Sequence, residues 1–177
     1  MTSHTDVATA MTNDTLGSVA LIGAIITMGL VAGVFSLYAH TIMPGLKHTD
    51  DRTFVAAFQA IDRAIINPWF MAGGFLGALA FTTAAAAVNL HRPALPWILA
   101  ALVLYLAAFI ATLAVNVPLN DTIKAAGDPA HITDPAAVRH RFHEARWAAW
   151  NLMRAITSTA AFGSLAWALV LHGRSGA

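Results

Sequence analysis

The chain has 177 residues, of which 58% are hydrophobic and 11% are charged, and its mean hydropathy is +0.64. Soluble domains carry about 25% charged residues, so this composition excludes a water-soluble globule, and a formal net charge of +1 argues against nucleic-acid binding through a basic surface. The lack of cysteine excludes disulfides, thiolate metal sites and cysteine nucleophiles. The composition therefore predicts a membrane protein that forms a single domain.

Four long segments lack Asp, Glu, Lys and Arg, and each has the length of one bilayer crossing, about 20 residues. We therefore predict an all-α integral membrane protein, an antiparallel four-helix bundle with spans near residues 19–39, 69–88, 96–117 and 149–171. Residues 1–17 are expected to be a disordered polar leader, residues 18–173 the membrane domain and residues 174–177 a tail. Because the leader contains no Lys or Arg, the first span is not expected to be a cleaved signal peptide.

The distribution of positive charge predicts the orientation. With four spans, the termini and the loop between spans two and three share one side, which holds Arg92 and Arg174. The other side holds the remaining Lys and Arg residues, namely Lys47, Arg52, Arg63, Lys124, Arg139, Arg141, Arg146 and, at the span edge, Arg154. The positive-inside rule then places the two larger loops in the cytoplasm and both termini outside. We therefore expect a protein that is integral to the cytoplasmic membrane.

Both larger loops are predicted to be helical. After Pro44 and Gly45, Thr49 or Asp50 can cap an interfacial amphipathic helix that precedes the second span. Its apolar face is assigned to Phe54, Phe58, Ile61 and Ile65, and its other faces to Arg52, Gln59, Asp62 and Arg63. In the second loop, Asp134 followed by Pro135 predicts the start of a helix that continues into span four as a cytoplasmic extension.

Polar residues gather at the cytoplasmic ends of the predicted spans. They are Tyr38, His40, Arg63, Asn67, Asn116, Asn120, Asn151 and Arg154. If the fourth helix is continuous, a rotation of about 100° per residue puts one polar stripe on it, comprising His140, His143, Glu144, Trp147, Asn151, Arg154 and Ser158. Polar groups at this depth are costly and often functional, so any chemical site is expected in a pocket at this end. The alternative for Arg154 is snorkelling to lipid phosphates, with Trp147 and Trp150 as interfacial anchors.

A metal site is one chemical interpretation of this stripe. His140 and Glu144 are spaced i,i+4, His143 is nearby, and His40 could approach from the first span. Three imidazoles and a carboxylate would suit zinc, copper or non-haem iron. The alternative is a solvated interfacial helix that binds no metal.

Four sequence stretches resemble the anthrone-oxygenase-like family of small four-span membrane proteins. They are NVPLND at 116–121, WAAWNLMR at 147–154, YAHTIMPGL at 38–46 and FQAIDRAIINPWF at 58–70, so the resemblance covers nearly the whole chain after the leader. It implies a four-helix membrane bundle and, from the characterised fungal members, oxygenation of an aromatic anthrone at a methylene carbon to give a quinone. The positions that match are Asn116, Pro118, Asn120, Trp147, Asn151 and Arg154.

This resemblance implies an oxygenase-like oxidoreductase that acts on a small lipophilic substrate. An anthrone methylene becomes reactive once its enolate forms, so the site needs a base and a group that holds the oxyanion. We expect His40 to be the base because histidine titrates near neutrality, and Arg154 with Asn116 or Asn151 to hold the oxyanion. We expect Trp147 to stack on the flat ring, and Tyr38, Asn67 and Asn120 to complete the substrate-binding set. No cofactor beyond molecular oxygen is assigned, and the metal interpretation stays open.

A non-enzymatic role also stays open: a small membrane scaffold, a partner subunit or a carrier of hydrophobic molecules. The expected partners are the lipid bilayer and, for an enzyme, a small lipophilic substrate; self-association into a homo-oligomer is undecided. An enzyme predicts a ligand-sized cavity at the inner end of the bundle. A scaffold predicts that the same polar groups satisfy one another and leave no cavity.

Overall fold

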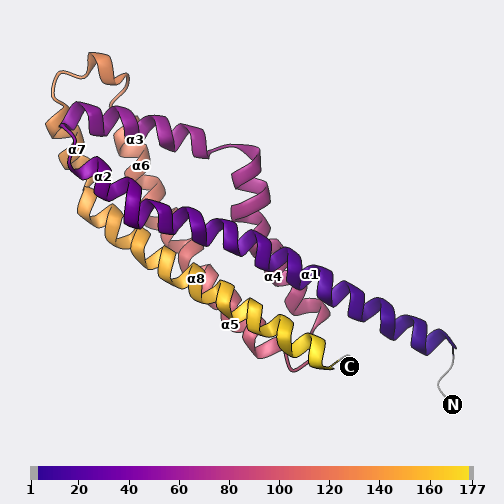
Figure 1. Ribbon diagram of the computed structural model, residues 1–177. Coiled ribbons are helices and arrows are strands. Elements are labelled where there is room, and N and C mark those ends of the chain that lie inside the picture. The colour runs from indigo at the N-terminus through magenta and orange to yellow at the C-terminus, as the bar shows by residue number, and fades with distance from the viewer. Residues whose placement is uncertain (1–3, 176–177) are drawn as a thin grey trace.

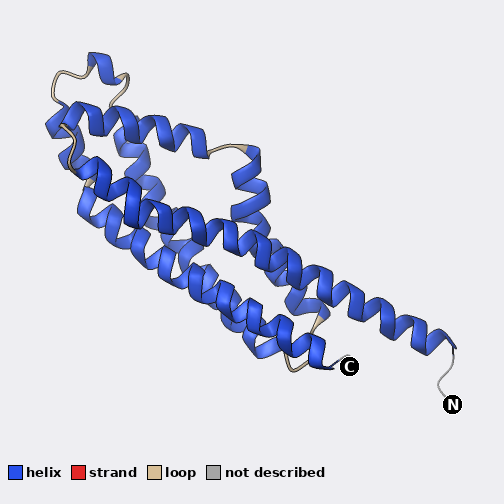
Figure 2. Ribbon diagram, viewed as in Figure 1, coloured by secondary structure: helices blue, strands red, loops and turns tan. Residues whose placement is uncertain are grey.

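The computed structural model describes residues 4–175, with side chains described for residues 14–174. Every element within these residues is a helix, and Figure 2 shows no strand among them. The all-α fold predicted from the sequence is therefore confirmed.

Four helices form the bundle: α1 (His4–Leu37), α4 (Gly77–Val88), α5 (Leu95–Ala111) and α8 (Glu144–Ser175). The connecting elements are α2 (Met43–Lys47), α3 (Asp51–Ile65), α6 (Val117–Lys124), the 3₁₀ turn η4 (Pro129–His131) and α7 (Pro135–Phe142). Three further stretches are π-helical: η1 (Tyr38–Ile42), η2 (Trp69–Leu76) and η3 (Thr112–Asn116).

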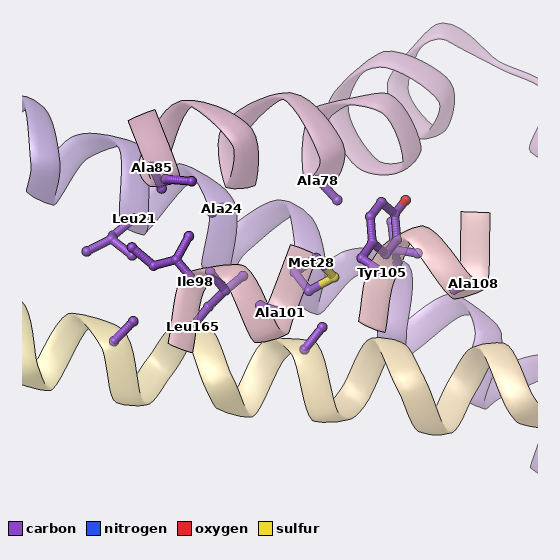
Figure 3. Packing of buried hydrophobic residues seen from close by; sticks show 14 of the residues in the cluster. Leu21, Ala24, Met28, Ala78, Ala85, Ile98, Ala101, Tyr105, Ala108 and Leu165 are labelled. Carbon is purple, nitrogen blue, oxygen red and sulfur yellow. The ribbon is translucent and has the colours of Figure 1, made fainter. Parts of the chain in front are cut away.

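The helices α1, α4, α5 and α8 pack as an antiparallel bundle in which α1 and α5 each contact both α4 and α8. Figure 3 shows the core between them, where Leu21 and Met28 of α1 meet Ile98 of α5 and Leu165 of α8. Tyr105 is also fully buried in this core, and its hydroxyl donates to the carbonyl oxygen of Phe75 at 2.7 Å. The core is therefore apolar, and its one tyrosine hydroxyl has a hydrogen-bond partner.

Four helical segments among the described residues are long and apolar enough to cross a membrane: Asp14–Lys47, Trp69–Val88, Leu95–Lys124 and Pro135–Arg174. Each contains one predicted span. Large apolar side chains cover much of their outer surface; Val103, for example, is 67% exposed. Such a surface is stable in contact with lipid, where apolar side chains need no further burial. The protein is therefore a membrane protein.

Residues 4–17 of the expected leader form the first turns of α1. Residues 1–3 of the leader lie outside the described residues. No proline interrupts this segment, and a helix that is already nucleated by an apolar span propagates at little further cost. The Asp14 carboxylate also pairs with Arg92 of the α4–α5 loop at 2.5 Å, which holds this part of α1 against the rest of the bundle.

The connecting helices α2, α3, α6 and α7 gather at the end of the molecule opposite the two termini (Figure 1). We call this the α3 end. The α3 helix begins at its N-cap Asp50, whose carboxylate accepts hydrogen bonds from the backbone N–H and the side chain of Thr53, and these bonds lower the pKa of Asp50. The apolar face of α3 packs on α6 and α7, with the rings of Phe58 and Phe142 only 4.5 Å apart.

The extension predicted for the fourth helix is present but interrupted. His143 adopts a left-handed backbone conformation with φ of 52°, which ends α7 and separates it from α8. The side-chain positions of His140 and Trp147 are therefore not related by one continuous helix. The single polar stripe predicted from His140 to Ser158 is wrong at its first two histidines.

Each π-helical stretch lies beside a proline: η1 just before Pro44, η2 just after Pro68 and η3 just before Pro118. Proline has no N–H to donate, and its ring clashes with the carbonyl group four residues earlier. In η1 and η3 a local π-helical turn rearranges the backbone hydrogen bonds that the following proline interrupts. Pro68 instead stands at the start of its helix, where no N–H donor is needed. Each of the three π-helical stretches contributes residues to the lining of the cavity described next. The prolines beside them lie where the spans meet the α3 end.

Candidate functional site

A cavity of about 190 Å³ lies at the α3 end of the bundle. Four phenylalanine side chains contribute to its walls: Phe35, Phe58, Phe70 and Phe75. Its polar lining consists of Tyr38, Asp62, Thr112, Asn120, Lys124, Trp147 and Arg154. The lining also includes Ile66, Leu113 and Val117, which are exposed on the outer surface, so the cavity opens sideways beside them.

Arg154 is the most unusual residue of the cavity, because its guanidinium is buried without a carboxylate partner. It is 5% exposed and forms no ion pair with any described residue. Nη1 donates to Thr112 Oγ1 at 3.0 Å and Nη2 to Asn151 Oδ1 at 2.8 Å, while Nε has no partner among the described side chains. The guanidinium carbon lies 4.3 Å from the ring centre of Phe35. An uncompensated buried charge is costly, so an anionic group bound in the cavity would supply the missing partner.

Two buried asparagines support α8 from behind the cavity. Asn151 donates from Nδ2 to the carbonyl oxygen of Phe35 at 3.0 Å, which ties α8 to α1 and fixes the oxygen that Arg154 contacts. Asn116 donates from Nδ2 to the carbonyl oxygen of Trp147 at 3.2 Å, which ties η3 to α8. Neither asparagine lines the cavity. Both therefore position residues that do.

A chain of hydrogen bonds crosses the cavity wall toward α3. The Trp147 indole N–H donates to Asn120 Oδ1 at 2.6 Å, and Asn120 Nδ2 donates to Asp62 Oδ1 at 2.7 Å. The Lys124 ammonium lies 3.1 Å from Asp62 Oδ2 and 3.0 Å from Asp121. The cavity thus has a cationic group on α8, fixed by Asn151 and Thr112, and a carboxylate on α3, fixed by Asn120 and Lys124 of α6.

The aromatic rings around Trp147 give the cavity flat apolar surfaces. Trp147 is buried, with its ring centre 5.5 Å from Tyr38 in a tilted arrangement and 5.4 Å from Phe58 in an edge-on arrangement. The Arg154 guanidinium carbon lies 5.5 Å from the same indole ring. A planar aromatic molecule matches such a surface in shape and polarity.

The structure brings together part of the predicted site. Tyr38, Asn120, Trp147 and Arg154 line one cavity, as expected. His40 does not reach it: its side chain is exposed, contacts the Thr41 hydroxyl at 2.7 Å, and lines a separate groove between η1 and α8. Consecutive side chains on a helix are about 100° apart, so Tyr38 and His40 point to opposite sides.

Asn67 has a structural contact rather than a place in the cavity. Its Nδ2 donates to the carbonyl oxygen of Ala64 at 2.8 Å, and its Oδ1 accepts from the backbone N–H of Phe70 at 2.9 Å. These bonds close the turn between α3 and η2. The prediction that Asn67 belongs to the substrate-binding set therefore has no support in the geometry.

The predicted metal set is not assembled. The ring centres of His140 and His143 are 6.1 Å apart. The Glu144 carboxylate accepts two hydrogen bonds from Arg139, at 2.7 and 2.9 Å. His40 lies on another face of the bundle. Within the part of the chain that the structure describes, no three His, Asp or Glu side chains gather to hold a metal ion. The break at His143 removes the i,i+4 relation on which the prediction depended.

Sequence reasoning missed the acidic member of the site. The sequence pattern places Asp62 and Gln59 on the other faces of α3, but both side chains are buried against α6 and the loop that follows it. The signal was present: Asp62 follows Phe54 and Phe58 at intervals of four residues, which places it on the apolar face of the helix. An acidic residue within an apolar stripe of a helix therefore predicts a buried carboxylate, and this is the signal that identifies Asp62 as a candidate site residue.

The comparison with protein families identifies the chain. The model of the family described as Anthrone oxygenase matches residues 63–164, more than half of the chain. This range includes Asn120, Trp147 and Arg154, whereas α1 and Asp62 precede it. No curated protein and no solved structure matches the chain. The protein therefore belongs to the anthrone oxygenase family, as the four sequence stretches predicted.

Proposed function

We propose that this protein uses molecular oxygen to convert the methylene carbon of a small, flat, lipophilic aromatic compound, of the anthrone type, into a ketone. The reaction takes place in the cavity at the α3 end. The observation that carries this proposal is the buried Arg154, which lines an aromatic cavity and has no carboxylate partner in the part of the chain that the structure describes. Membership of the anthrone oxygenase family supports the reaction type, although the fold alone would not.

The cavity favours a substrate that is apolar, planar and carries one oxygen. The ring system packs against Trp147 and the phenylalanines, and the carbonyl oxygen lies toward Arg154. The volume of about 190 Å³ is below the range of about 300–1,000 Å³ for drug-sized ligands. The substrate is therefore small, or it extends through the side opening beside Ile66 and Leu113. That opening lies on the apolar outer surface, so a lipophilic compound enters from the membrane.

Arg154 contributes to the reaction by stabilising negative charge. When the methylene group loses a proton, the charge of the resulting enolate resides mainly on the oxygen, next to the guanidinium. A fixed donor that binds a developing oxyanion accelerates such steps by about 10²–10³-fold. The overall change replaces two hydrogens of the methylene group by one oxygen atom of O₂, and the other oxygen atom leaves as water.

The scaffold alternative predicts polar groups that satisfy one another and leave no cavity. A cavity is present, and both Arg154 Nε and Asn116 Oδ1 lack a partner within the described residues. These two observations favour a binding site. The predicted orientation completes the proposal: the α3 end, with most of the Lys and Arg residues, faces the cytoplasm, and both termini lie outside. The lipid bilayer and the substrate are the partners that we propose, and a second copy is not required by the cavity.

The test uses detergent-purified protein and anthrone as the probe. We expect oxygen uptake and quinone absorbance above the rate of spontaneous anthrone oxidation, and a loss of about 100-fold in the Arg154→Met variant. Arg174→Met is the matched control, because Arg174 is exposed at the opposite end of α8. Mass spectrometry of the purified protein should also detect a bound aromatic compound. No turnover of anthrone together with no bound aromatic compound would refute the proposal, as would full activity of Arg154→Met.

A further inference from the structure

The oxygenation proposed above needs a group that accepts a proton from carbon, and His40 lies outside the cavity. Asp62 of α3 lines the cavity with its carboxylate and is 4% exposed. The proposed role of Arg154 in binding the oxyanion gives this carboxylate no function. A carboxylate that is buried beside an apolar ligand site is a functional candidate on physical grounds, because its burial is costly unless it is used or fully paired.

We propose that Asp62 is the catalytic base of this protein, an inference that rests on the proposed function. Its two oxygens have about four lone-pair positions. The structure shows two donors to them, Asn120 Nδ2 at 2.7 Å and the Lys124 ammonium at 3.1 Å. The remaining lone pairs are available to a ligand in the cavity, while the two donors hold the carboxylate in place.

The neighbours of Asp62 suit a proton acceptor. Lys124 balances the charge of the carboxylate, and Asp121 shares that lysine on its outer side at 3.0 Å. Asn120 is itself fixed by the indole N–H of Trp147, the residue against which the substrate ring is proposed to pack. The base and the ring-binding surface are thereby held in one hydrogen-bonded unit. Arg154, on the opposite helix, stabilises the oxyanion that proton removal creates.

The chemistry balances with O₂ as the only co-reactant. Asp62 takes one methylene proton, and the electron pair of that C–H bond becomes part of the enolate. The carbon then bonds to one atom of O₂, which is reduced to a peroxide anion, and Asp62 returns its proton to the outer oxygen to form a hydroperoxide. Asp62 next takes the second proton from carbon while the O–O bond breaks, which forms the ketone. The departing hydroxide recovers that proton as water, and Asp62 ends as it began.

The experiment compares Asp62→Asn with wild-type protein, using anthrone for turnover and anthraquinone for binding, the latter followed by tryptophan fluorescence. Asparagine has the same shape and keeps an acceptor for Asn120, so we expect binding to change less than threefold. We expect turnover to fall by about 10²–10⁴-fold, the usual contribution of a positioned base. The turnover that remains should show a larger isotope effect with dideuterated anthrone, because breakage of the C–H bond then limits the rate.

Asp121→Asn is the control, because it alters the same lysine from outside the cavity, and we expect it to keep wild-type turnover. If Asp62→Asn does not purify, the equal-sized pair Asp62→Glu and Asp62→Gln provides the comparison, with turnover retained mainly by the glutamate. Wild-type turnover in Asp62→Asn, or an equal loss in Asp121→Asn, would overturn the role of Asp62 and leave the proposed function intact. Wild-type protein that neither oxidises anthrone nor binds anthraquinone would overturn both.

Discussion

Replacement of Arg154 by methionine should separate stability from activity. Methionine has a similar length and no charge, so it fills the space of the guanidinium stem without requiring an anion. In the structure this residue has only neutral partners, Thr112 and Asn151, together with the ring of Phe35. We expect the variant to fold and to lose activity, because the charge of the guanidinium is proposed to bind the ligand and has no ionic partner that would stabilise the bundle.

The expected size of the stability effect follows from these contacts. The variant loses two hydrogen bonds from a charged donor, worth about 1.5–3 kcal/mol each, and a cation–ring contact worth about 0.5–2 kcal/mol. It also relieves the desolvation of an unpaired charge, which amounts to several kcal/mol. The Thr112 hydroxyl keeps its bond to the carbonyl oxygen of Ala108 at 2.8 Å, so Asn151 Oδ1 alone loses its donor. The free energy of unfolding should therefore stay within about 2 kcal/mol of the wild-type value.

Arg139→Met is the matched comparison. Arg139 also contacts a ring, that of Phe54 at 4.1 Å, but it pairs with Glu144 at 2.7 Å and Asp51 at 3.1 Å. Its removal leaves two partly buried carboxylates without their cation and should destabilise the protein by about 2–3 kcal/mol, a value reduced for solvent screening. Thermal unfolding in detergent, followed by circular dichroism, gives the order of stability, and anthrone oxidation gives the order of activity. If Arg154→Met is less stable than Arg139→Met, the guanidinium is structural and the reasoning fails.

Three further predictions concern packing, the excluded histidine and the orientation. A Cβ at Gly77 would lie 2.8 Å from a backbone carbonyl oxygen, whereas one at Gly163 would meet nothing within 4 Å. Gly77→Ala should therefore lower the unfolding free energy by about 1–3 kcal/mol, and Gly163→Ala should not. Equal melting temperatures of the two variants would contradict this prediction. His40→Ala should keep wild-type anthrone turnover, because the side chain faces away from the cavity, and a tenfold loss would return it to the list of candidates. In this cysteine-free chain, a thiol introduced as His91→Cys should react with a membrane-impermeant reagent in intact cells, and one introduced as Ala130→Cys only after permeabilisation; the reverse pattern would invert the proposed topology.

The helical fold and the candidate site were predictable to different extents. The four membrane-crossing helices follow from long uncharged segments, because the hydrocarbon interior selects strongly against charge. The meeting of Asn120, Trp147 and Arg154 was also expected, since polar groups at one depth in separate helices favour one another over lipid. The beginning of α1 was not, because a short polar segment carries no strong signal for either helix or coil.

The errors at the site have geometric causes. The sequence pattern places Tyr38 and His40 at the same depth in the membrane, but it does not show which side of the helix faces the cavity. Only Tyr38 points into the cavity. The metal set required one unbroken helix, and the left-handed conformation of His143 is not specified by the local sequence. Asp62 was overlooked because acidic residues of amphipathic helices usually face water, whereas here α6 covers that face with Asn120 and Lys124.

The π-helical stretches beside the prolines also affect how the sequences of relatives should be aligned. A π-helical turn contains one residue more than an α-helical path of the same rise. Deletion of a single residue within Thr112–Asn116 would restore a regular helix with little rotation of the residues beyond it. Asn120 would then keep its place beside the indole of Trp147. A one-residue gap at this position in a homologue is therefore compatible with the same site, whereas a one-residue gap within the regular helix of α5 would rotate the residues beyond it by about 100°.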